Sequence, residues 1–478
     1  MTLTPRYTTL LQLQSDLRTQ TISCSELVEH YLQNIKKQAD LNVFVEVFED
    51  EAKAQAKALD LKLKTTPNEL GRLFGIVLSI KDVICYEGHQ VTAAAKILEG
   101  FTSLFSATAI ERLLAEDAII IGRVNCDQFA MGSTNENSHY GATRNALNPS
   151  KIPGGSSGAS AVSVQADMCL ASLGSDTGGS VRQPAAFCGV VGMKPTYGRI
   201  SRYGLLAYGS SFDQIGTLTH SIGDAALLLE IMAGADDFDS TASQTIVDEY
   251  SNPEPARPYK IAYFDAALQH EGIDTNIKKQ TFDYLDTLRA AGHQVESVEF
   301  ELLDYMIPAY YVLTTAEASS NLSRYDGVRF GYRNKEAKSL EEVYTLSRTE
   351  GFSMEVKKRI MLGSFVLSAG YYDAYYTKAQ QIRRLLSDRT KAILSDYDFI
   401  ILPVSPTSPW DIGSTLSDPL AMYLSDIFTV YANMVGMPAV AFPIGTHSED
   451  NMPIGIQVMA NKFEERKLLS FANQVYQK

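Results

Sequence analysis

Apolar residues recur along the first part of the chain in two different periods. Between residues 23 and 37 they return every three to four positions, and Ser23-Cys24-Ser25-Glu26 has the form of a capping box that would start a helix there. Short apolar runs predict strands at 43–48, 73–80 and 118–121, with helices at 50–62 and 106–117. Strands that alternate with helices predict an α/β fold, with a large central sheet flanked by helices on both faces.

The second half of the chain contains a long helical stretch between sheet-forming segments. A helix is predicted at 221–233, a strand at 260–264, and a Tyr-rich, mainly helical excursion at about 303–390. Sheet patterns then return at 399–402, 439–442 and 454–458, before a terminal helix from Phe463. Residues 251–255 are either a domain boundary or a surface insertion. Because the sheet pattern resumes late, we expect one domain over 1–478.

Between residues 132 and 216 the composition shifts to Gly, Ser, Thr and Asn. The segment is not repetitive and keeps apolar residues throughout, which argues against low complexity. Glycine permits positive φ and a close approach of the backbone to a ligand. This segment is therefore the candidate site, within a core predicted at about 70–220.

Charge and composition exclude several classes of function. The formal net charge is −14, and basic runs are limited to short clusters such as Lys357-Lys358-Arg359. A chain that grips nucleic acid alone usually carries a basic footprint, so any RNA would be held mainly by another subunit. Residues 1–7 lack the pattern of a secretion signal, and no apolar run approaches the ~18 residues of a membrane span. We expect a soluble, cytoplasmic protein.

Cofactor sites are not indicated by any motif in the chain. The five cysteines include no Cys-x-x-Cys pair, and no histidine stands at metal-ligand spacing, so we expect reduced, mostly buried thiols and no metal. Cys188, in a small apolar segment, is interpreted as a packing residue rather than a nucleophile. Without a Gly-Lys dipeptide or a Gly-x-Gly turn, no ATP or NAD site is expected on this chain.

Two loops rich in Gly and Ser carry the candidate chemistry, 153–160 and 174–184. The first contains Gly-x-Ser-x-Gly, the pattern of a hydrolase nucleophile elbow. That interpretation requires a strand directly upstream, where Asn148 to Pro153 predict a loop, and a histidine base that no motif supplies. Without histidine, a neutral lysine of lowered pKa can deprotonate a hydroxyl nucleophile. Lys81, at the end of an apolar run, is the candidate, although a lone lysine there is usually a solvated surface residue.

Three blocks together resemble the amidase-signature family in order and spacing. They are Gly75 with Lys81-Asp82, Gly154-Gly155-Ser156-Ser157-Gly158, and Gly174-Ser175-Asp176-Thr177-Gly178-Gly179-Ser180-Val181-Arg182. The similarity continues through 191–198 and 213–216 and covers most of the chain. It implies the family's fold, with a central mixed sheet.

The resemblance also implies the roles of three catalytic residues. Ser180 would be the acylated nucleophile, Ser156 a bridging serine after a cis peptide bond, and Lys81 the base, so that the two serines relay a proton in place of imidazole. Thr177-Gly178-Gly179-Ser180 would form an oxyanion hole from backbone N–H groups. Taken alone, this segment could equally be a helix N-cap without chemistry.

Within the family the chain resembles glutamine-hydrolysing subunits of tRNA-dependent amidotransferases. The segments that carry this resemblance are 131–138, 317–327 and 359–363. It implies L-glutamine as substrate, with Arg359 for the carboxylate, Asp426 for the ammonium and Tyr310 nearby. Singly, these three have ordinary explanations as a solvated basic helix face, a surface or capping carboxylate and a core residue.

The same resemblance implies a complex in which ammonia converts Glu-tRNA(Gln) to Gln-tRNA(Gln). Two partner subunits are expected, a B-type kinase-transamidase that binds tRNA and uses ATP with Mg²⁺, and a small C-type subunit; this chain would bind no cofactor. Two other hypotheses stay open from the sequence. One is a free-standing amidase for another small amide, and the other is an inactive scaffold that only binds partners.

Overall fold

The computed structural model describes residues 6–270, 272–414 and 425–476. Residues 1–5, on which the expected absence of a secretion signal partly rests, lie outside this part of the chain. The described residues form one eleven-stranded sheet in the order β1-β3-β2-β4-β6-β5-β10-β11-β9-β7-β8. The strands are β1 Phe44–Val47, β2 Val77–Lys81, β3 Ile119–Val124, β4 Ala171–Asp176, β5 Val191–Lys194, β6 Gln214–Thr219, β7 Lys260–Tyr263, β8 Gln294–Ser297, β9 Phe399–Pro403, β10 Ala439–Thr446 and β11 Pro453–Met459.

The sheet is mixed. Strand β2 runs parallel to β3 and β4, and β7 runs parallel to β8 and β9. The middle of the sheet, from β4 through β6, β5, β10 and β11 to β9, is antiparallel. The predicted α/β class with a mixed central sheet is confirmed. Strands that follow the polar segment 251–255 join this same sheet.

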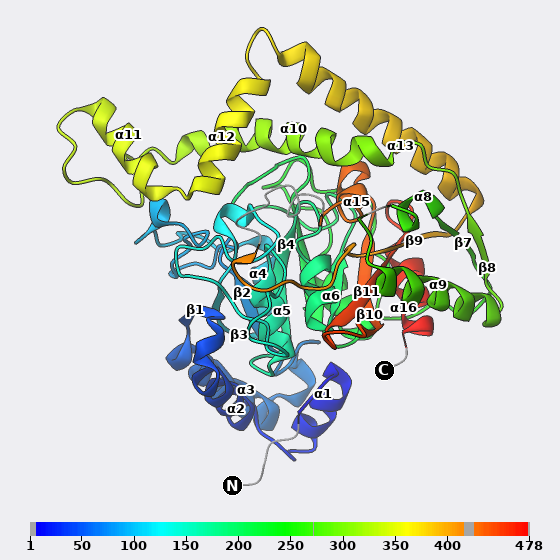
Figure 1. Ribbon diagram of the computed structural model, residues 1–478. Helices are drawn as coiled ribbons and strands as arrows, with labels where there is room; N and C mark the ends of the chain where they lie inside the picture. Colours follow the sequence, from blue (N-terminus) through cyan, green and yellow to red (C-terminus); the bar gives the residue numbers. More distant parts are fainter. Residues whose placement is uncertain (1–5, 271, 415–424, 477–478) are drawn as a thin grey trace.

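Helices pack against the sheet and extend beyond one of its ends. A layer of long helices, α10, α12 and α13, crosses the top of the view in Figure 1, and α11 projects at its upper left. The helices are α1 Leu10–Arg18, α2 Cys24–Lys37, α3 Glu49–Thr65, α4 Thr108–Ala115, α5 Gly158–Gln165, α6 Arg182–Cys188, α7 Ile222–Met232, α8 Asp265–Leu268, α9 Thr275–Ala290, α10 Leu303–Asn321, α11 Leu340–Gly351, α12 Met354–Val366, α13 Lys378–Asp396, α15 Val430–Val435 and α16 Glu465–Val475.

Most predicted elements are present, with shifted ends. The capping box at Ser23 forms as predicted, with the Ser23 and Glu26 side chains bonding each other's backbone N–H. The strand predicted at 73–80 starts only at Val77, because Gly75 turns the chain with a φ of 76°. It also continues through Lys81, which places that lysine inside the sheet.

The topology brings the three sequence blocks to one edge of the sheet. Lys81 and Asp176 are the last residues of β2 and β4, two parallel neighbours whose carboxyl ends share this edge. The carboxyl ends of parallel strands are where α/β folds usually place a site. Helix α5 starts at Gly158, directly after Ser156 and Ser157. The loop 177–181 follows β4, so all three blocks meet there.

Three further findings concern the ranges described above. No helix there combines the length and the apolar character needed to cross a bilayer. No group of three or more His, Cys, Asp or Glu side chains in them is placed to hold a metal ion. All five cysteines are free and buried, as predicted, and Cys188 packs with its thiol against the Pro153 carbonyl.

Candidate active site

The amine of Lys81 lies among three serine hydroxyls. Its Nζ is 2.6 Å from Ser156 Oγ, 2.9 Å from Ser157 Oγ and 3.0 Å from Ser175 Oγ. Lys81 is fully buried, so the interpretation as a solvated surface lysine is wrong. Burial lowers the pKa of the amine to about 8, against the opposing field of Cys126 and the nearby carboxyl groups. A substantial fraction of the amine is therefore neutral near physiological pH.

The neighbouring protons determine which serine can give its hydrogen to this amine. The Ser157 hydroxyl donates to the Ser175 carbonyl at 3.1 Å, so it can only accept from Lys81. A neutral amine keeps two N–H donors, which Ser157 and Ser175 can accept, and presents one lone pair. The shortest of the three contacts leaves that lone pair for the Ser156 hydroxyl. The geometry thus fits proton transfer from Ser156 to Lys81.

Ser156 and Ser180 lie in adjoining loops at this edge. The peptide bond between Gly155 and Ser156 is cis, as the family resemblance implied. Backbone N–H of Ser157 donates to the Ser180 carbonyl at 3.1 Å, which ties the two loops together. Within the described residues, no hydrogen bond joins the hydroxyls of Ser156 and Ser180. Ser180 is 8% exposed, whereas Ser156 is fully buried, so the hydroxyl expected to attack is the accessible one.

The segment 177–180 surrounds Ser180 with backbone groups. The N–H of Gly179 donates to Asp176 Oδ1 at 2.9 Å, so it is already engaged. Those of Gly178 and Ser180 donate to no acceptor in the described part of the protein. They are therefore the better oxyanion donors in this conformation. Helix α6 starts beyond this segment, at Arg182.

Side chains pack so closely here that Gly178 and Gly179 leave no room for a Cβ. One added at Gly178 would meet the Tyr310 hydroxyl at 2.4 Å, and one at Gly179 would meet Thr429 Oγ1 at 2.2 Å. Thr429 Oγ1 also donates to the Gly178 carbonyl at 2.6 Å. Gly179 has a φ of 129°, which strains any other residue. The glycine pair allows Tyr310 and Thr429 to close over the segment.

A buried ion pair supports this segment from below. Asp176 bonds the guanidinium of Arg182 at 3.0 Å, and both side chains are fully buried. The same carboxylate accepts from the backbone N–H of Val181 at 3.2 Å. Although burial opposes ionisation, Arg182 lowers the pKa of Asp176 to about 2. The loop is thus fixed by a permanent charge.

Arg359 and Asp426 both lie in the interior, beside the oxyanion segment. They are 5% and 8% exposed, so the solvated-surface interpretations of both residues are wrong. Arg359 donates from Nη1 to the Tyr208 hydroxyl at 2.8 Å and from Nε to Glu355 at 2.8 Å. Its guanidinium lies 5.4 Å from the centre of the Tyr311 ring.

Asp426 is held by hydroxyl groups. Ser133 Oγ lies 2.9 and 2.8 Å from its two carboxyl oxygens, and the Tyr311 hydroxyl donates to it at 3.2 Å. Burial raises the pKa of this carboxyl to about 6, while the Ser133 bond and the Arg359 charge oppose that rise. Tyr311 thus joins a cation and an anion in one pocket, a pairing suited to a zwitterionic ligand.

Several residues of this pocket were not singled out from the sequence. They are Ser133, Ser157, Ser175, Tyr208, Tyr311 and Thr429. Ser133 and Ser157 fell inside quoted motifs, so their blocks gave a signal without a role. Tyr208, Tyr311 and Thr429 become neighbours only through the tertiary fold, and sequence spacing gives no sign of that.

Comparisons with known proteins agree with this geometry. The family model described as Amidase matches residues 26–469. The A subunit of glutamyl-tRNA(Gln) amidotransferase from Chlorobium phaeobacteroides (strain BS1) is 48% identical over 465 residues, 97% of each chain. The protein of the same name from Chlorobium luteolum is 49% identical over 476 residues, covering 97% of this chain and 96% of that one.

Solved structures show the same fold. The crystal structure of the A subunit of glutamyl-tRNA(Gln) amidotransferase from Thermotoga maritima superimposes with a TM-score of 0.77 at 38% identity, over 94% of this chain and 90% of that one. A crystal structure described as an amidase gives a TM-score of 0.82 at 28% identity, over 97% and 98% of the two chains. The matched residues include all three blocks that meet at the sheet edge. The chain belongs to the amidase-signature family.

Proposed function

We propose that this chain is the glutamine-hydrolysing subunit of a glutamyl-tRNA(Gln) amidotransferase. The observation that carries the proposal is the 2.6 Å contact between the buried Lys81 amine and the Ser156 hydroxyl, next to Ser180. The buried Arg359 and Asp426 support glutamine as the amide, since free glutamine carries one charge of each sign. Relatives of nearly full length bear the name of such a subunit.

In the proposed reaction the chain transfers the glutamyl group to Ser180. Neutral Lys81 takes the Ser156 proton, and Ser156 takes the Ser180 proton as its oxygen attacks the side-chain amide carbon. The N–H groups of Gly178 and Ser180 stabilise the oxyanion that forms. The proton returns along the same path to the leaving ammonia, and water then releases glutamate by the reverse relay. A catalytic hydrogen bond between the two serines would tighten when substrate binds.

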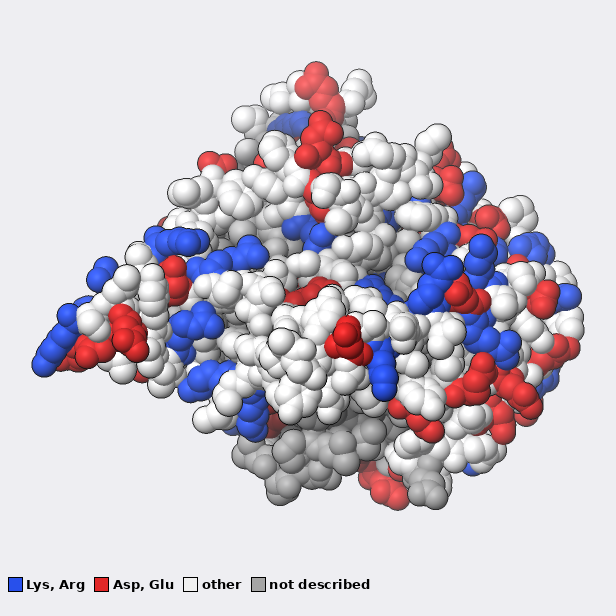
Figure 2. Space-filling model, turned by 90° about the horizontal axis from the view of Figure 1, so that it is seen from above, with Lys and Arg blue, Asp and Glu red and all other residues white. Residues whose placement is uncertain are grey.

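The ammonia would be used by partner subunits. We propose that a B-type subunit binds the tRNA and ATP with Mg²⁺, that a small C-type subunit completes the complex, and that this chain carries no cofactor. On the face shown in Figure 2, Lys and Arg side chains are interspersed with acidic ones and form no continuous basic surface. This distribution, with the net charge of −14, supports tRNA contact mainly through the partner.

A matched pair of buried lysines allows a sharp test. Lys194 is also fully buried, and burial lowers its pKa to about 7, but its Nζ donates to the Pro195 carbonyl. We expect Lys81→Met to abolish glutamine hydrolysis in the co-expressed complex and Lys194→Met to leave measurable activity. Retained glutaminase activity in Lys81→Met would refute the relay.

The same assay separates the alternative functions. Hydrolysis of diverse amides by the isolated chain, indifferent to partners, would favour a free-standing amidase. No turnover of any amide, alone or in the complex, would favour a scaffold subunit.

A further inference from the structure

Asp213 connects two parts of the site that have separate tasks. It lies directly before β6 and is 2% exposed. Its Oδ1 accepts from the Thr177 hydroxyl at 2.6 Å and from the Gly209 N–H at 3.1 Å. Its Oδ2 accepts from the Tyr208 N–H at 2.9 Å. One buried carboxylate thus holds two separate stretches of chain.

The two stretches lead to different functional groups. Thr177 precedes Gly178, whose N–H is a proposed oxyanion donor. Tyr208 receives the hydrogen bond of Arg359 on its hydroxyl, at 2.8 Å. Hydrogen bonds to a charged acceptor are stronger and more directional than neutral ones. A shift of Tyr208 or of Thr177 is therefore felt by the other through Asp213.

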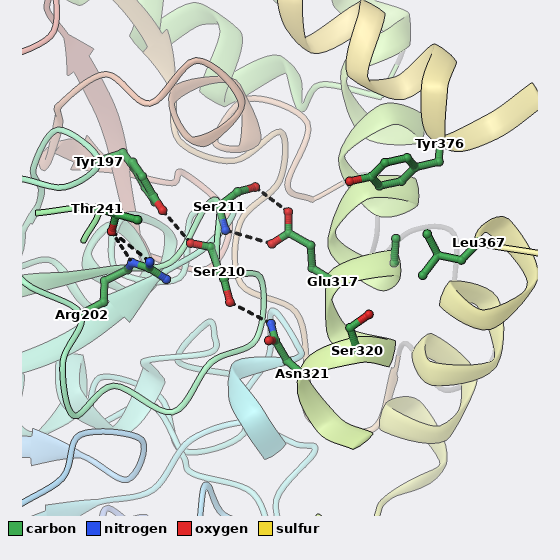
Figure 3. A pocket seen from close by; sticks show the side chains of 11 residues that line it. Tyr197, Arg202, Ser210, Ser211, Thr241, Glu317, Ser320, Asn321, Leu367 and Tyr376 are labelled. Carbon is green, nitrogen blue, oxygen red and sulfur yellow. Dashed lines mark hydrogen bonds between the residues drawn. The ribbon is translucent and has the colours of Figure 1, made fainter. Parts of the chain in front are cut away.

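The other side of the 208–211 segment is fixed by different residues, as Figure 3 shows. Glu317 accepts from the Ser211 N–H at 2.9 Å and hydroxyl at 2.6 Å, and Asn321 donates to the Tyr208 carbonyl at 3.1 Å. These contacts line a cavity of about 370 Å³ on the side away from Asp213. None of them reaches the oxyanion segment, so the link to Thr177 runs through Asp213.

We propose that Asp213 is a positioning residue that couples the carboxylate-binding Arg359 to the oxyanion segment through Tyr208 and Thr177. Glutamine that engages Arg359 then holds Tyr208, and the shared carboxylate holds the Gly178 N–H in line for the attack on the amide. This inference rests on the proposed function, since it assigns glutamine as the ligand that Arg359 binds. It predicts that one substitution impairs both binding and acylation.

The first test compares two buried aspartates in the intact complex. Asp224 is a matched control, because burial also raises its pKa to about 6 and it accepts from a backbone N–H, that of Leu10, far along the chain. At pH about 9, where Lys81 is neutral, we expect Asp213→Asn to lower kcat about 100-fold and to raise KM for glutamine about tenfold. Asp224→Asn should change either by less than about threefold, although both variants lower Tm. Equal kinetic effects of the two substitutions would overturn the proposal.

A second variant keeps the proposal testable if Asp213→Asn does not fold. Thr177→Val removes a single hydroxyl of nearly the same shape, and we expect it to raise KM for glutamine although Thr177 is not expected to contact the substrate carboxylate. Combined with Tyr208→Phe, which removes the hydroxyl that receives the Arg359 bond, it should show a non-additive effect on KM. Strict additivity would contradict the coupling.

A third measurement separates this inference from the proposed function. A neutral fluorophosphonate phosphonylates an activated serine without needing Arg359. If the chain hydrolyses no glutamine but reacts with this probe at Ser180, the proposed function fails. The Asp213 link is then judged by the probe reaction alone. A rate that Asp213→Asn lowers no more than Asp224→Asn does would overturn it.

Discussion

The rate at which Ser180 is modified should rise with pH in a way set by the burial of Lys81. With a pKa of about 8, about one Lys81 amine in eleven is neutral at pH 7, against about one in three thousand at the ordinary 10.5. Burial therefore increases the population of the base about 300-fold, equivalent to ~3 kcal/mol. The ionised form is the one lost as pH rises, so reactivity grows about tenfold per pH unit below 8 and levels off above it.

A neutral fluorophosphonate is the suitable reagent for this measurement, because only groups of the protein titrate. The second-order rate of phosphonylation would be followed from pH about 6 to about 10, with Lys81→Met as the control that lacks the base. We expect a midpoint near 8 in the natural chain and no step there in the variant. A flat profile, a midpoint near 10.5, or the same step in Lys81→Met would refute the assignment of Lys81 as the base.

Three further predictions concern the glutamine pocket and the absence of imidazole chemistry. Arg359→Gln should raise KM for glutamine by about 10- to 100-fold, the range expected for a lost charge-assisted bond, and steady-state kinetics with unchanged KM would contradict this. For Asp426, burial raises the pKa to about 6, so the carboxylate that binds the ammonium is lost as pH falls. KM should then rise below about pH 6, and Asp426→Asn should remove that dependence; an unchanged acid limb in the variant would exclude this role. His139→Gln should keep most of the turnover, since the relay uses no imidazole, and a loss comparable to that of Lys81→Met would show a missing proton carrier.

The regular elements could be predicted because their signals are local. A capping box and a periodic apolar face determine α2, and continuous apolar runs determine β2, β3 and β9. The ends were less predictable, as at Gly75, where the turn delays β2 although the apolar run has already begun. The pairing order of the eleven strands depends on contacts between distant segments, which no short window of sequence contains.

Within the site, motifs located the chemistry but not its supports. Lys81, Ser156 and Ser180 stood in recognisable blocks, and the fold brings those blocks to one edge of the sheet. Tyr208 and Asp213 could not be placed in the same way, since their importance comes from what they join. The ordinary prior for Lys81 and Arg359, solvent exposure, fails here because each is surrounded by hydroxyl groups or a carboxylate that replaces water.

The most direct test of the central claim is the covalent state of Ser180 during turnover. The intact complex would be mixed with glutamine, quenched in acid within one turnover, and analysed by mass spectrometry of the whole chain and of its peptides. We predict a mass increase of one glutamyl group on the peptide that contains Ser180, absent in Ser180→Ala. A glutamyl adduct on Cys188 or another residue, or glutamine hydrolysis that persists in Ser180→Ala, would contradict the account.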